Sequence, residues 1–195
     1  MYSPAQNGTR FNMSYKVPPT STSDFGAMKV GAGLSVTNGT VSATLGLLNY
    51  GFFSDGTQPN PVANAINIVT FSNTGAANGI SITGGNALTV VNAGTYTKMF
   101  TLIVSKTAGG TSSVSFWLRY NGVDVAGSRQ DLELTNTLAQ IFTSGNFTIN
   151  MAAGSNIQMC WSSADTTVTL AALPAATTPT RPTGDSIKVT LTRIS

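Results

Sequence analysis

Residues 95–105 read TYTKMFTLIVS, and residues 113–120 read SVSFWLRY. In both stretches apolar side chains recur at every second position, which is the period at which a β-strand returns to the same face. The residues that share one face are Tyr96, Phe100, Leu102 and Val104 in the first stretch, and Val114, Phe116, Leu118 and Tyr120 in the second. Each stretch therefore predicts a long strand with one apolar face packed on a core.

The same alternation continues through the rest of the chain after residue 45. We expect strands at residues 48–53, 66–72, 79–83, 87–91, 95–105, 113–120, 123–126, 131–142, 146–151, 156–162, 167–173 and 186–194. Turn dipeptides separate them, at Gly84-Gly85, Gly109-Gly110, Asn121-Gly122, Gly145-Asn146 and Gly154-Ser155. No stretch shows the 3.6-residue period of a helix. Many short strands separated by turns predict an all-β sandwich or barrel.

Two of these strands carry apolar side chains on both faces. Met99 and Ile103 alternate with Phe100, and Trp117 alternates with Phe116. The outer faces of an isolated sandwich contact water and are normally polar. Strands that are apolar on both faces therefore predict that a further layer of protein covers the outer face. That layer is either a loop or N-terminal strand of the same chain, or a second copy in a closed homo-oligomer. We favour the oligomer, with Met99, Ile103 and Trp117 as its candidate interface residues.

The first 25 residues show no regular period but contain isolated aromatic and basic side chains. The aromatic residues are Tyr2, Phe11 and Tyr15, and the cations are Arg10 and Lys16. A disordered tail is expected to be poorer in aromatic residues. The two interpretations are a floppy terminus and an extended arm that becomes ordered on a partner, using the aromatic residues as anchors.

Residues 26–45 predict a short hairpin, because Leu34 and Val36 alternate with polar residues before the turn dipeptide Asn38-Gly39, and Val41 resumes the alternation. The expected organisation is therefore an N-terminal arm and hairpin at 1–45 and a β-sandwich domain at 46–195.

The composition favours a structural protein over a nucleic-acid-binding one. Charged residues make up only 9% of the chain, while there are 29 Thr, 20 Ser and 20 Gly. The net charge is +3, and no cluster of Lys or Arg could follow a phosphate backbone. The interactions of a neutral polar surface change little when salt screens charge, so the surface tolerates water of varying salt content.

Several kinds of site are excluded by residues that the chain lacks. There is no histidine, so a Ser-His or Cys-His dyad and a His-ligated metal are impossible. The single cysteine, Cys160, allows neither an intrachain disulfide nor a cysteine-based zinc site, and we expect a buried, inert thiol. No apolar segment at the N-terminus and no run of 18 apolar residues occurs, so neither a signal peptide nor membrane insertion is predicted.

The acidic residues do not form a convincing catalytic or metal site. Asp131 and Glu133 share a strand face, but no aromatic residue nearby in the sequence would stack on a sugar, and Arg129 is a simpler partner. Asp55 and Asp165 lie in expected loops without the spacing of a calcium loop. We therefore expect no enzyme, metal or cofactor.

Several motifs, in a particular order, resemble a known family. They are AGTY at 93–96, FWLRYNG at 116–122, AGSNIQ at 153–158 and CWSS at 160–163, followed by TPTRP at 178–182 and the final strand at 186–194. This order resembles the jelly roll of the tumour-necrosis-factor and complement-head class, in the version found in virion proteins of tailed phages, especially cyanophages. MKVGAGLSV at 28–36 also resembles short β-repeats of phage fibres.

The resemblance implies a Greek-key jelly-roll sandwich of about ten strands, usually a homotrimer packed around one sheet, without catalysis. It leads us to expect a virion protein, assembled in the host cytoplasm and exposed on the particle surface. The leading hypothesis is a capsid decoration (cement) protein whose N-terminal arm binds the major capsid protein or another virion protein. The alternative is a fibre or receptor-binding adhesin that recognises a host glycan or protein through the loop at 172–184. A depolymerase is the least favoured reading.

Overall fold

The computed structural model describes residues 24–25, 28–29, 34–37, 40–43, 48–136 and 140–195. The chain divides into two compact units, Met1–Leu47 and Leu48–Ser195. In the first unit, strand β1 (Asp24–Phe25) pairs antiparallel with β2 (Met28–Lys29), and β3 (Leu34–Thr37) pairs antiparallel with β4 (Thr40–Ala43). The hairpin predicted around Leu34 and Val41 is therefore confirmed, while its turn at 38–39 lies outside the described residues.

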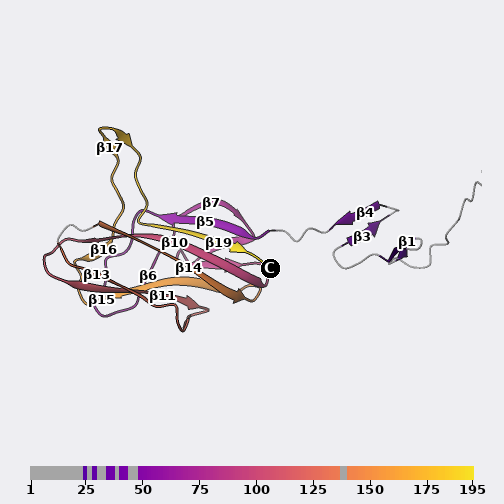
Figure 1. The fold of residues 1–195 in the computed structure, drawn as a ribbon, viewed down its shortest axis with the longest axis horizontal. Helices are drawn as coiled ribbons and strands as arrows, with labels where there is room; N and C mark the ends of the chain where they lie inside the picture. Colours follow the sequence, from indigo (N-terminus) through magenta and orange to yellow (C-terminus); the bar gives the residue numbers. More distant parts are fainter. Residues whose placement is uncertain (1–23, 26–27, 30–33, 38–39, 44–47, 137–139) are drawn as a thin grey trace, which may run out of the picture. The chain divides into compact units, whose positions relative to one another are not determined.

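The second unit is a sandwich of two antiparallel sheets (Figure 1). Sheet I has the order β14 (Gln140–Met151), β10 (Gly94–Lys106), β19 (Ile187–Arg193), β5 (Tyr50–Asp55) and β7 (Asn73–Asn78), and β16 (Val168–Leu170) also pairs with β10. Sheet II has the order β12 (Val123–Asp124), β11 (Ser112–Tyr120), β15 (Asn156–Ser163), β9 (Ala87–Val90) and β8 (Ile80–Thr83), with β13 (Gln130–Leu134) on β11 and β6 (Asn67–Ile68) on β15.

The order of the strands along the chain makes this sandwich a jelly roll. The chain crosses between the sheets from β9 to β10, from β10 to β11, from β13 to β14 and from β14 to β15. The last long strand, β19, returns to lie beside the first strand of the sandwich, β5. Repeated crossing that brings the first and last strands together is the Greek-key connection of a jelly roll. The predicted all-β Greek-key sandwich is confirmed.

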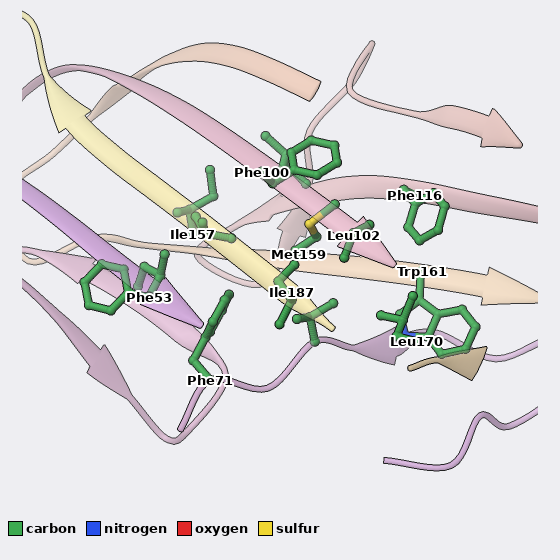
Figure 2. Close-up of a cluster of buried hydrophobic side chains, with 14 of the residues drawn as sticks. Phe53, Phe71, Phe100, Leu102, Phe116, Ile157, Met159, Trp161, Leu170 and Ile187 are labelled. Atoms are coloured by element: carbon green, nitrogen blue, oxygen red, sulfur yellow. The ribbon is translucent and has the colours of Figure 1, made fainter. Parts of the chain in front are cut away.

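The core lies between the two sheets and is built from the alternating apolar residues of the long strands. Along β11, and along β10 as far as Leu102, the core-facing residues are buried and alternate with more exposed ones, whereas every residue of β10 from Leu102 to Lys106 is buried. Figure 2 shows side chains from both sheets meeting there: Phe53, Phe71, Phe100, Leu102, Phe116, Ile157, Met159, Trp161, Leu170 and Ile187. Each large side chain removed from water in this way contributes about 1.5–3 kcal/mol.

The expected strand at 131–142 is two strands, and the expected turn at Gly145-Asn146 lies inside β14. The stretch contains β13 and the beginning of β14, which pair with different sheets. Gly145 pairs with Phe100, and a Cβ at residue 145 would lie 2.6 Å from that aromatic ring. Glycine is needed here for the close approach of a ring to the backbone rather than for a turn.

The loop expected at 172–184 contains a further hairpin, in which β17 (Ala176–Thr177) pairs with β18 (Thr180–Arg181). This hairpin projects from the sandwich (Figure 1). Its base is closed by the reciprocal backbone hydrogen bonds between Leu173 and Gly184, at 2.8 and 3.0 Å.

Gly79 links β7 to β8, and replacing it with alanine is expected to destabilise the fold. Its φ of +67° belongs to the left-handed region, and a Cβ there would overlap the amide nitrogen of the buried Asn49 side chain. We expect Gly79→Ala to lower the free energy of unfolding by roughly 2–4 kcal/mol, combining backbone strain with overpacking. Urea unfolding followed by tryptophan fluorescence measures this loss.

The matched control for Gly79→Ala is Gly85→Ala. Gly85 also has a positive φ, +71°, but nothing lies within 4 Å of the position of its Cβ. This variant therefore isolates the backbone cost, about 1–2 kcal/mol. Equal losses in the two variants would show that the contact with Asn49 is of no consequence.

Candidate oligomer interface

The face of sheet I that points away from the core carries large apolar side chains exposed to solvent. We call it the sheet I outer face. Its apolar members are Tyr50 and Phe52 on β5, Met99 on β10 and Phe142 on β14, with exposed fractions of 38, 40, 57 and 61%. Clustered exposed apolar residues on one face are typical of an interaction surface.

The register of the strands places Met99 and Phe52 in one row across the sheet. Met99 pairs with Asn146 of β14 and with Thr190 of β19, and Thr190 pairs in turn with Phe52 of β5. A groove of about 610 Å³ is lined by both apolar side chains and by Thr101, Ser144, Asn146, Lys188 and Thr190. The Phe52 ring lies over Gly75 of β7, where a Cβ would be 2.8 Å from the ring.

The rest of this face is built mainly from threonine, serine and asparagine. Threonines alternate outward along the central strands, at Thr97 and Thr101 on β10 and at Thr190 and Thr192 on β19. Among the described residues that alternate onto this face, Lys188 is the one charged side chain. The free-energy cost of removing such a face from water is smaller than for a face with many charges. Burying an unpaired charge costs far more than burying a hydroxyl group that forms a hydrogen bond.

The three interface residues proposed from the sequence do not come together. Met99 lies on the sheet I outer face, but Ile103 is only 2% exposed and is buried within the protomer. Trp117 lies on β11 and therefore on the outer face of the other sheet. The alternation shows which residues share a face of one strand. It does not show to which sheet each strand belongs.

Three members of the face, Tyr50, Phe52 and Phe142, were not among the residues proposed from the sequence. The signal for Phe52 was present, because the adjacent pair Phe52-Phe53 within a strand must place one ring on each face. Phe53 is fully buried, and Phe52 points outward. Phe142 was assigned to the end of one long strand, although it belongs to the beginning of β14.

The aromatic and basic residues proposed as an anchoring arm lie outside the described residues. They are Tyr2, Arg10, Phe11, Tyr15 and Lys16.

Of the carboxylates considered for catalysis or metal binding, Asp55, Asp131 and Asp165 are engaged by neighbouring hydrogen-bond donors. The Nε and Nη2 atoms of Arg129 donate to the two oxygens of Asp131, at 2.8 and 2.7 Å, and lower its pKa. Asp55 accepts a hydrogen bond from the backbone N–H of Thr57 at 2.8 Å. Hydrogen bonds from Ser112 and Thr167 hold the pKa of Asp165 well below its usual range.

The single thiol is buried, and the acidic side chains of the described residues do not gather into a metal-binding group. Cys160 is fully buried, and burial raises the pKa of its thiol. The part of the chain that the structure describes contains no group of three acidic or cysteine side chains placed to hold a metal ion. Nor does that part contain a helix long and apolar enough to cross a bilayer.

No protein-family model matches this chain, and no curated protein matches it. Among solved structures it is similar to the crystal structure of murine APRIL at pH 8.5, with 11% sequence identity and a TM-score of 0.45, covering 75% of this chain and 99% of that chain. That protein is a jelly roll of the tumour-necrosis-factor family. The strand order of sheets I and II makes this sandwich a jelly roll.

Proposed function

We propose that this chain is a non-enzymatic structural protein of a virion, a homotrimer that decorates the outer capsid. The observation that carries the proposal is the sheet I outer face, where Phe52 and Met99 line an exposed groove on a jelly-roll sandwich. A surface of this kind is buried when copies of the chain close around a threefold axis. The trimer then presents sheet II to the surroundings.

The virion role is supported by the sequence rather than by the sandwich. The order of motifs from residue 93 to residue 194 resembles virion jelly rolls of tailed phages, and the charge content of 9% gives a neutral, hydroxyl-rich surface. The aromatic residues Tyr2, Phe11 and Tyr15 are suited to anchor an extended N-terminal arm in grooves of the major capsid protein. The partners in this proposal are therefore two further copies of the chain and a capsid subunit.

The proposal is tested by separating the arm from the sandwich. We expect a chain that lacks residues 1–25 to keep the mass of a trimer in light scattering, because the interface lies on sheet I. The same chain is expected to lose co-sedimentation with capsids from the source virus, which the full chain retains. Capsid binding that survives the deletion would contradict the anchoring role of the arm.

Antibody labelling of intact particles gives the position of the protein directly. If the antibody carries a gold label, gold spread regularly over the head of the virus particle is the expected result for a decoration protein. Gold confined to the tail or to one vertex would exclude decoration and favour the fibre or adhesin role. Unlabelled particles would overturn the virion assignment.

A further inference from the structure

A second surface feature lies on the outer face of sheet II and has no part in the proposed trimer. The first part of this feature is a hollow of about 450 Å³, which is lined by Ser115, Trp117, Asp124, residues 125–127, Arg129 and Ser162. A neighbouring hollow of about 450 Å³ shares Ser115 and Ser162 and is otherwise lined by Thr111, Ser112, Ser113, Ser163, Ala164 and Asp165. Because they share two lining residues, the hollows form one depression, which we call the sheet II groove.

The aromatic end of the groove is held in place by hydrogen bonds. Trp117 is partly exposed, and its indole N–H donates to a carboxylate oxygen of Asp124 at 2.9 Å. Arg119 donates to the same oxygen at 2.9 Å. These bonds restrain the indole, so an exposed aromatic surface is available without a large loss of side-chain entropy on binding.

The wall beside Trp117 is also fixed. The buried hydroxyl of Ser128 accepts a hydrogen bond from the backbone N–H of Leu118 at 2.9 Å and donates to the carbonyl of Val125 at 2.7 Å. The backbone N–H of Val125 donates to the carbonyl of Leu118 at 2.9 Å. The segment at 125–127 is thus tied to β11 and forms a preformed side of the groove.

The polar groups of the groove are hydroxyls and charges that are already paired. Ser115 donates to Asp131 at 2.6 Å, and Arg129 forms a two-point ion pair with the same carboxylate. The Arg129–Asp131 pair uses two of the five guanidinium N–H groups, so the others are available to a ligand. Because Arg129, the cation in the lining, is paired with a carboxylate, no excess positive charge favours a phosphate or sulfate.

The dimensions fit an elongated ligand. Ser113, Ser115 and Trp117 occupy alternate, outward-facing positions of β11, with Ser162 opposite Ser115 on the neighbouring strand. Four residues of a strand span about 13 Å. A ligand along this line would meet one aromatic surface at one end and several hydroxyls at the other.

We propose that the sheet II groove binds a neutral oligosaccharide, with one sugar ring stacked on Trp117 and the next toward the serines. Sugars present apolar C–H faces and a rim of hydroxyls, which match an aromatic platform beside serines and an Arg–Asp pair. No aromatic residue lies near Asp131 in the sequence. Strand pairing supplies one, because Asp131 pairs with Ser115, two residues from Trp117. The groove belongs to a single protomer, so the inference does not rest on the trimer or on the virion role.

The test uses the full chain and a panel of neutral di- to tetrasaccharides of glucose, galactose, mannose and N-acetylglucosamine. Sialylated and sulfated counterparts serve as charged probes. We expect saturable binding of at least one neutral oligosaccharide, seen by saturation-transfer NMR and by a change in tryptophan emission. Trp117→Ala is expected to weaken this binding by at least about tenfold.

Two further variants keep the test decisive. Arg129 is exposed and bonded at the surface, so Arg129→Gln is expected to fold normally and to weaken binding several-fold. Val91→Ala, at an exposed apolar residue beyond the groove, is expected to bind like the natural chain. The inference is overturned if no neutral oligosaccharide binds at millimolar concentration, if only charged probes bind, or if both groove variants bind undiminished. None of these outcomes depends on the oligomeric state.

Discussion

Replacing Lys98 with methionine is expected to raise the free energy of unfolding by several kcal/mol at neutral pH. Lys98 lies on β10 between Tyr96 and Phe100, in the positions that face the core, and is 1% exposed. Burial lowers the pKa of its amine from 10.5 to about 7. At about 1.4 kcal/mol per unit, that difference corresponds to a cost of roughly 5 kcal/mol for the protonated form. Methionine has a similar length and removes the amine.

The same burial makes the stability depend on pH in a defined direction. Below about pH 7 the amine is protonated in both the folded and the unfolded chain, so the full cost is present. Between about 7 and 10.5 only the unfolded chain holds the proton, so stability rises with pH. We expect the natural chain to become more stable from about pH 7 to about pH 9, and Lys98→Met to show no such rise.

Urea unfolding across this range measures both effects. By about pH 9 at least half of the Cys160 thiols of the unfolded chain are ionised, which opposes the rise in stability because burial raises the thiol pKa in the folded chain. Lys98→Met keeps the same thiol, so the difference between the two chains reports the amine alone. Arg181→Met is the control, because Arg181 is exposed on β18, away from the sheet I outer face, and removing its charge is expected to change neither the stability nor its pH dependence appreciably. If Lys98→Met and the natural chain keep the same rise with pH, Lys98 is not the residue responsible for it.

Lys98 also shows where sequence reasoning stops short. The alternation on β10 correctly grouped Tyr96, Phe100 and Leu102, and the core cluster contains all three. Lys98 falls at the same period, so it too had to face inward, yet a lone cation is normally expected to reach water. The alternation of residues alone predicts which face of a strand a side chain lies on. How deeply that side chain is buried depends on the sheet that packs over it.

Strand β7 was missed for the opposite reason. Its sequence, NTGAAN, contains no large apolar residue, and all six residues are exposed. It is a strand because it pairs with β5, where the register shifts between Gly51 and Phe53. Edge strands of this kind are held by backbone hydrogen bonds and bury little surface of their own, so apolar alternation cannot detect them.

The candidate interface was only partly predictable. Sequence reasoning correctly placed Met99 on the face of β10 opposite Phe100, and β10 carries a two-sided pattern as expected. It could not assign Trp117 to the opposite side of the sandwich, because that requires knowing that the chain crosses from sheet I to sheet II between β10 and β11. Fold class follows from local pattern, whereas a surface assembled from four strands follows from topology.

The second large effect is expected from Met99→Lys, which should convert the proposed trimer into monomers. Met99 is 57% exposed in the protomer, so lysine at this position can extend into water and the sandwich is expected to fold. In a closed trimer the same position would place three ammonium groups against a face that has few charges. Burying an ion without a partner costs several kcal/mol even after relaxation, and the cost is incurred three times.

Light scattering over a range of protein concentrations measures this dissociation. Val123→Lys is the matched control, because Val123 is 70% exposed on sheet II and its substitution introduces the same charge away from the proposed interface. A Met99→Lys chain that keeps the mass of the natural oligomer would show that the copies meet through another surface. If the Met99→Lys chain dissociates, its binding to capsids is expected to weaken as well. A monomer binds the capsid through one arm, whereas in a trimer the binding of one arm raises the effective concentration of the other two.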